Sequence, residues 1–110
     1  MSSKRLTKDL NFCLINDLSD SGHEEIINLI KENDIKNLFF YSSAIKQLKN
    51  EVERRKWKAS SEDLSIEVYY CQKSADKFGI LFEDSFQSSG LGQLVEMIAM
   101  SKKTLVIGAL

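Results

Sequence analysis

Short apolar runs alternate with segments of helical spacing along the 110-residue chain. Leu10–Asn16 is apolar at nearly every position, which is typical of a strand covered on both faces of a parallel sheet. Ser21 and Glu24 have the spacing of a capping box, and the apolar spacing after them predicts a helix that ends at about Asn33. Leu38–Tyr41 predicts a second, short strand. The first part of the chain is therefore expected to form a strand, a helix and a strand.

The middle of the chain predicts one long helix and a third strand. Ser42 or Ser43 can cap a helix that is expected to close at about Lys58. Trp57–Leu64 is expected to make a short connection. Ser65–Tyr70 alternates between apolar and polar positions, which is typical of a strand with unequal faces.

The last third of the chain repeats the alternation. Gln72–Phe78 predicts a short helix, which Gly79 stops at the usual C-terminal position. A longer helix is expected to start at about Ser89–Gly90, and Thr104–Ile107 predicts the final strand. Strands that alternate with helices across short connections predict an α/β fold with right-handed crossovers. We expect a three-layer sandwich with a mostly parallel sheet of four to five strands flanked by helices.

Composition limits the class of protein. The chain holds no proline and no repeat, so residues 1–110 are expected to form one domain, with 1–9 as a flexible or loosely packed N-terminus. A net charge of −1 argues against strong direct binding of nucleic acid. The N-terminus lacks the apolar region of a secretory signal, and no apolar run approaches a membrane span of about 20 residues. A cytoplasmic protein without a membrane partner is expected.

The two cysteines have different settings. Cys13 lies inside the first apolar run and is expected to be a buried core residue, because cysteine packs readily in apolar interiors. Cys71 follows the third strand at the point where a helix begins, and open α/β sheets gather reactive groups at the carboxyl ends of their strands. The positive end of that helix, with Lys73 and Lys77 nearby, would favour the thiolate. The alternatives are that Cys71 is structural and that both lysines point to water.

A glycine-rich segment before the last helix is the second candidate. Gly90, Leu91 and Gly92 stand where a helix starts, so unpaired backbone N–H groups could help to hold a thiolate, persulfide or oxyanion near Cys71. The alternative is that both glycines only allow a tight turn and close helix packing.

Other chemistry has little support. His23 is the only histidine, and one histidine with two separated cysteines makes no plausible zinc site, so we expect no metal and no cofactor. The serines lie in no hydrolase elbow, and phosphate-binding glycine patterns are absent. The charged segment Lys46–Lys58 interleaves Glu51 and Glu53 with its bases, which favours a solvated helix face over a polyanion-binding patch.

Several segments together resemble one family. Cys71–Ile80 resembles the cysteine segment of the DsrE/TusD sulfur-relay family, and Phe86–Glu96 is similar to that family's segment before the last helix. Ser101–Gly108 resembles its closing strand, and Leu38–Tyr41 its second strand. The Gly-Leu-Gly-Gln-Leu run within Phe86–Glu96 favours a D/E-type subunit.

The resemblance implies parallel strands flanked by helices and an assembly into homo- or hetero-hexamers. It implies that Cys71 accepts a sulfane sulfur as a persulfide from a TusA-like donor and passes it to a TusE-like acceptor. The destination would be 2-thiouridine of tRNA or, in sulfur oxidisers, dissimilatory sulfur metabolism. Asp17–Gly22 departs from the family in being short and acidic, which leaves the partners and the composition of the hexamer open.

Two other functions stay open. The chain could be a non-catalytic assembly subunit in which Cys71 is incidental. It could also be a small-anion-binding module that uses Gly90 and Gly92.

Overall fold

Five parallel strands form one sheet in the computed structural model, which describes residues 11–18, 22–82 and 86–108. The strands are β1 (Asn11–Ile15), β2 (Ile35–Phe40), β3 (Glu67–Cys71), β4 (Gln87–Ser89) and β5 (Lys103–Ile107). Their order across the sheet is β4-β3-β2-β1-β5, and every neighbouring pair is parallel. The expected parallel α/β sheet is confirmed.

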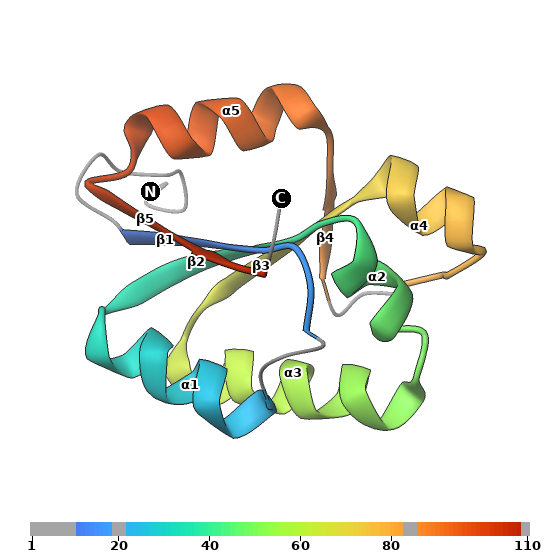
Figure 1. The fold of residues 1–110 in the computed structure, drawn as a ribbon, viewed down its shortest axis with the longest axis horizontal. Helices are drawn as coiled ribbons and strands as arrows, with labels where there is room; N and C mark the ends of the chain where they lie inside the picture. Colours follow the sequence, from blue (N-terminus) through green and yellow to red (C-terminus); the bar gives the residue numbers. More distant parts are fainter. Residues whose placement is uncertain (1–10, 19–21, 83–85, 109–110) are drawn as a thin grey trace.

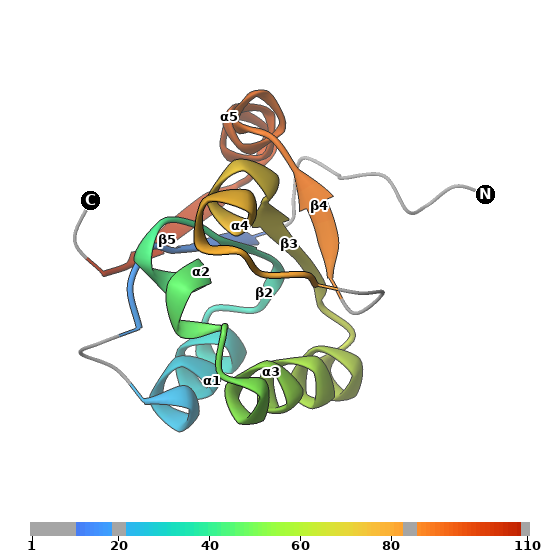
Figure 2. The same ribbon diagram turned by 90° about the vertical axis from the view of Figure 1, so that its right-hand side faces the viewer.

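Helices cover both faces of this sheet. They are α1 (His23–Glu32), α2 (Ser43–Gln47), α3 (Glu51–Leu64), α4 (Gln72–Phe78) and α5 (Leu91–Met100). Figure 1 shows α1 and α3 together on one side of the sheet and α5 on the other, which confirms the three-layer arrangement. The shorter helices α2 and α4 contact each other at the end of the sheet that faces the viewer in Figure 2.

Strand order explains why α5 lies apart from the other long helices. From β1 to β4 each new strand is added on the same side of the one before it. The chain then returns across the sheet through α5 to place β5 beside β1. Because parallel crossovers are right-handed, a return in the opposite direction puts its helix on the opposite face.

Two buried clusters fill the spaces between the layers, and alternation along each strand sends neighbouring side chains to different clusters. On β1, Cys13 and Ile15 belong to the cluster on the α1/α3 face, whereas Phe12 and Leu14 belong to the cluster under α5. A strand buried on both faces has no polar side, which explains the nearly continuous apolar runs in the sequence.

The structure corrects the prediction of one long helix in the middle of the chain. That segment forms two helices, because α2 ends at Gln47 and Asn50 caps a new helix by accepting hydrogen bonds from two backbone N–H groups of its first turn. Helix α3 then continues to Leu64, so the expected connection from Trp57 to Leu64 is helical. Ser65 is the left-handed C-cap of α3 and not part of the strand.

Other boundaries also differ from the expectation. The first helix has Gly22 as its N-cap, with the Gly22 N–H donating to Glu25 Oε1 at 3.1 Å. The expected cap Ser21 and the N-terminal residues 1–9 lie outside the described residues. Within the described part of the chain, no helix is long and apolar enough to span a membrane.

Candidate functional site

Cys71 lies where the chain leaves β3 and enters α4 without an intervening loop. It is the last residue of β3 and also the N-cap of α4. Gly79 ends the same helix in the left-handed conformation at φ 67°, as the sequence predicts. The strand end therefore determines the position of the thiol, and the short helix turns the chain away from it.

The chain turns in opposite directions after β3 and after β4, which are neighbours in the sheet. After β3, Ala75 of α4 and then Ile80 and Phe82 join the cluster on the α1/α3 face. After β4, helix α5 packs on the other face, where Leu94 shares a cluster with Cys71. Such a topological switch point opens a crevice at the carboxyl ends of parallel strands, which is where ligands bind in open α/β sheets.

A pocket of about 400 Å³ occupies this switch point. It is lined by Cys71, Gln72, Lys73, Asp76, Ser89, Gly90 and Leu91. Ser89 is the register partner of Cys71 across the β3–β4 pair. The structure thus brings three of the four predicted site residues to one pocket: the cysteine from β3, and Gly90 with Leu91 from the start of α5.

Gly92 is not among the lining residues. It lies exposed in the first turn of α5, and a Cβ added there would meet nothing within 4 Å. Gly90 also has open space around its Cβ position, with φ at −114°, so neither glycine is required by a tight turn or by close packing. Packing against the described residues therefore does not explain these two glycines.

Two polar side chains of the pocket form hydrogen bonds with other side chains. Gln72 Nε2 donates to Asp76 Oδ1 at 2.8 Å, and Ser89 Oγ donates to Gln93 Oε1 at 2.6 Å. No side chain caps the start of α5, because its N-cap is Gly90 and Ser89 is engaged with a side chain. Within the described part of the chain, the first N–H groups of α5 therefore have no side-chain cap beside the pocket.

The two lysines expected near Cys71 differ in position. Lys73 lines the pocket, whereas Lys77 places its Nζ 5.6 Å from the ring centre of Phe78. Lys73 is thus the cation that the structure places at the thiol's pocket. Asp76 lines the same pocket, so the local charge is balanced by one carboxylate.

Cys13 is placed very differently from Cys71. Its side chain is 0% exposed, and burial raises the pKa of its thiol to about 12. The expectation of a buried core cysteine is confirmed. Both cysteines are free, and they lie on opposite faces of the sheet with β2 between their strands. Cys71 itself is 2% exposed, so it forms part of the floor of its pocket.

The segments that directly follow β1 and β5 lie close together. Gly108, directly after β5, has φ 94°, and a Cβ added there would lie 2.6 Å from the backbone nitrogen of Asp17. Backbone contact therefore closes this part of the carboxyl edge. Among the described residues, no group of three or more His, Cys, Asp or Glu converges as a metal site.

The model of the DsrE/DsrF-like family matches residues 3–107. The chain belongs to the DsrE/DsrF-like family. Membership in this family indicates a role related to sulfur relay, at the level of the family. A comparison with curated proteins finds no match.

Sequence reasoning did not identify several polar residues of this DsrE/DsrF-like pocket. Ser89 was hidden because β4 is only three polar residues long and carries no strand pattern. Asp76 lines the pocket one helical turn after Gln72, and this i,i+4 spacing was a usable signal in the sequence.

His23 is partly buried at the contact between α1 and α3. Its Nε2 lies 3.0 Å from Ser60 Oγ, and its ring meets the edge of Trp57 at 4.6 Å between ring centres. Burial lowers the pKa of His23. This contact joins α1 to α3 and lies apart from the cysteine pocket.

Proposed function

We propose that the chain is a sulfurtransferase of the persulfide-relay type, with Cys71 as its nucleophile. The observation that carries the proposal is that Cys71 lines a pocket at the β3–β4 switch point, beside the uncapped start of α5. Gly90 and Leu91 contribute the α5 side of this pocket, and Gly92 lies in the same first turn. N–H groups at a helix start and the Lys73 ammonium both favour bound anions, and thiolates and persulfides are anions.

The transfer needs no net oxidation. The Cys71 thiolate attacks the outer sulfur of a donor persulfide, so that one S–S bond forms and the donor's S–S bond breaks. The donor leaves as a thiolate, and the outer sulfur remains on Cys71 as a persulfide. An acceptor thiolate then attacks that outer sulfur and takes it away, which returns the Cys71 thiolate.

The depth of Cys71 suits a carrier. A persulfide lengthens the side chain by one S–S bond of about 2.05 Å, so the transferable sulfur extends beyond the buried Sγ atom. The inner sulfur stays shielded, because Cys71 is 2% exposed. Shielding limits attack by bulk oxidants on the inner sulfur, and a docked partner would reach the outer one.

Partners and assembly follow from the family resemblance. We propose a TusA-like donor and a TusE-like acceptor, with the acceptor directing sulfur to tRNA 2-thiouridine or to dissimilatory sulfur metabolism. We also propose a reducing compartment such as the cytoplasm, where an unpaired thiol persists. An exposed apolar stripe on α5 supports a homo- or hetero-hexamer: Leu91, Val95 and Ile98 are 49%, 65% and 40% exposed.

Sulfur loading followed by intact mass spectrometry tests the proposal. The wild-type chain, Cys71→Ser and Cys13→Ala are each incubated with inorganic polysulfide as the sulfane sulfur donor. We expect the wild type and Cys13→Ala to gain the mass of one sulfur atom, which cyanide or a thiol removes. Cys71→Ser should keep the fold and gain nothing. An undiminished gain in Cys71→Ser would refute the role of Cys71.

The burial of Cys71 also favours a second candidate, a non-catalytic assembly subunit. If that function is correct, iodoacetamide modifies Cys71 only when the chain unfolds, at a rate that tracks urea concentration. The sulfurtransferase predicts modification of the folded wild type, and peptide mapping separates Cys71 from Cys13. If the chain is a small-anion-binding module, an anion should raise its melting temperature, and this stabilisation should persist in Cys71→Ser.

A further inference from the structure

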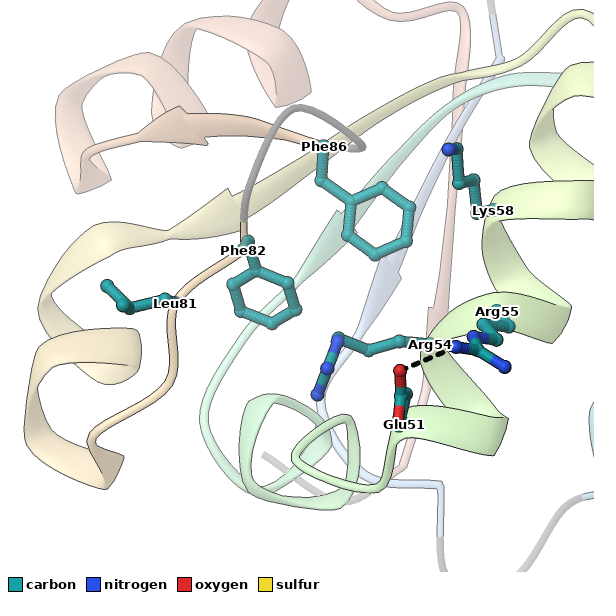
Figure 3. A pocket seen from close by; sticks show the side chains of 7 residues that line it. All are labelled: Glu51, Arg54, Arg55, Lys58, Leu81, Phe82 and Phe86. Carbon is teal, nitrogen blue, oxygen red and sulfur yellow. Dashed lines mark hydrogen bonds and ion pairs between the residues drawn. The ribbon is translucent and has the colours of Figure 1, made fainter.

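A second pocket, of about 300 Å³, lies on the face of the sheet opposite to the Cys71 cluster. Figure 3 shows its two walls, which face each other across the cavity. One wall is the first part of α3, and the other is made by Leu81, Phe82 and Phe86. The pocket is lined by Glu51, Arg54, Arg55, Lys58, Leu81, Phe82 and Phe86.

Positive charge dominates the α3 wall, which presents three cations and one carboxylate. Arg54 Nη1 donates to the carbonyl oxygens of Leu48 at 3.0 Å and of Lys49 at 2.9 Å. These acceptors carry no net charge, so they hold the Arg54 guanidinium in place without neutralising its positive charge.

The other two cations are more exposed. Arg55 pairs with Glu51 at 2.7 Å, and both side chains are largely in solvent. Lys58 forms no ion pair with another described residue. An exposed pair such as Arg55–Glu51 contributes little stability, so an incoming anion could displace Glu51 at small cost.

The opposite wall is apolar and aromatic. The rings of Phe82 and Phe86 lie 5.7 Å apart between their centres. Phe82 packs on Tyr70 at 4.4 Å and Phe86 on Phe40 at 6.0 Å, so both rings are fixed by the core. Leu81 is 86% exposed and extends the apolar surface at the pocket.

We propose that this pocket binds a small organic anion that carries an aromatic ring. Its anionic group, a phosphate or a carboxylate, would lie against Arg54, Arg55 and Lys58, and its ring against the phenylalanine wall. The separation of charge and apolar surface onto facing walls requires both features in one ligand. The volume suits a small molecule, and the carboxylates interleaved along α3 disfavour an extended polyanion.

NMR titration with three compounds tests each feature separately. Phenyl phosphate carries both the ring and the charge, inorganic phosphate carries the charge alone, and phenol carries the ring alone. We expect phenyl phosphate to bind about tenfold more tightly than either of the others, with shifts at Phe82, Phe86 and Arg54 Nε. Equal binding of inorganic phosphate would indicate an adventitious ion only and would overturn the proposal.

Lys58 and Lys56 provide matched variants on one helix. Lys58→Gln removes a pocket cation and should weaken phenyl phosphate about three- to tenfold. Lys56 pairs with Glu53 at 3.6 Å and does not line the pocket, so Lys56→Gln should leave the affinity unchanged. Equal effects of the two changes would mean that only net charge matters, which contradicts a built site.

Two further variants complete the test. Leu81→Ser alters an exposed side chain, so the fold should be retained. The affinity for phenyl phosphate should fall, whereas the affinity for inorganic phosphate should stay the same. Glu83 and Asp84 stand between Phe82 and Phe86 in the sequence. If phenyl phosphate binds only to the double variant Glu83→Gln/Asp84→Asn, the proposal is overturned. The carboxylates of Glu83 and Asp84 would then be the partners of the pocket's cations.

Discussion

Cys13 links the stability of the fold to alkaline pH. Its thiol is fully buried in the core, and burial raises its pKa from 9.0 to about 12. The folded chain therefore holds this proton in a pH range where the unfolded chain has lost it. The corresponding stabilisation is fully present below pH 9 and is lost as the pH rises from about 9 towards 12.

The size of this effect follows from the shift. A difference of about three pH units corresponds to roughly 4 kcal/mol in the free energy of unfolding, and about 2.5–3 kcal/mol of it would be lost by pH 11. Such a loss is a large part of the 5–15 kcal/mol that typically stabilises a domain. Burial also raises the pKa values of Tyr69 and Tyr70, so the effect of Cys13 must be measured as a difference between two chains that keep both tyrosines.

Urea unfolding at several pH values measures this difference. The two chains are Cys71→Ser and Cys71→Ser/Cys13→Ala, both under reducing conditions, so that Cys13 is the only variable thiol. At pH 8 the Cys13→Ala chain should be less stable by about 1 kcal/mol, because a buried sulfur is lost. By pH 11 this order should reverse, since only the chain with Cys13 loses unfolding free energy through the buried, protonated thiol. Parallel stability curves from pH 8 to 11 would refute the reasoning.

Three other predictions concern the scaffold and use urea or thermal unfolding. Gly108→Ala should lower the free energy of unfolding by about 2–4 kcal/mol, because its φ is 94° and the added Cβ would lie 2.6 Å from Asp17 N. Gly79→Ala, at φ 67° with open space around the added Cβ, should lower it by only about 1 kcal/mol. Equal losses in the two variants would contradict the steric argument. Asn50→Ala should cost about 1 kcal/mol through loss of the α3 cap, whereas no loss would mean that water replaces the side chain. Burial lowers the pKa of His23, so its contribution to stability is present above pH 6.5 and is lost as the pH falls. His23→Gln should therefore reduce the loss of unfolding free energy at acid pH. An unchanged pH dependence would assign that loss to other groups.

The sequence was sufficient to predict the class of fold. A strand buried on both faces must be apolar along its length, and this pattern is visible in the segment that forms β1. The end of α4 could also be predicted, because a left-handed C-cap selects glycine and Gly79 occupies it. Both signals are local, so they need no knowledge of distant contacts.

The errors arose where local signals were weak or were misinterpreted. Asn50 followed by acidic residues was a readable start signal for α3, but it lay inside a longer apolar spacing that suggested one helix. Trp57–Leu64 was expected to be a short connection, although Trp57 and Ser61 are both buried on α3 at helical spacing. Strand β4 could not be predicted, because its three polar residues are a strand only through pairing with β3.

The same distinction applies to the candidate site. Cys71 could be placed at a strand end from the sequence alone, and the pocket does contain it together with Gly90 and Leu91. The sequence could not show that Gly90 lines the pocket and Gly92 does not, since this depends on the orientation of α5 relative to the pocket. Ser89 required the register between β3 and β4, which a single sequence does not contain.

The position of the two cysteines on opposite faces of the sheet has a consequence for the proposed persulfide. The chain has only two cysteines, and β2 separates the strands that carry them, so Cys13 cannot act as a resolving thiol for Cys71. A persulfide on Cys71 therefore has no route to an internal disulfide with release of sulfide. Its lifetime would be set by the arrival of an external thiol, and an oxidised Cys71 would form mixed disulfides only between molecules. Non-reducing electrophoresis of the native complex would then reveal the partners as disulfide-linked bands that a reductant removes.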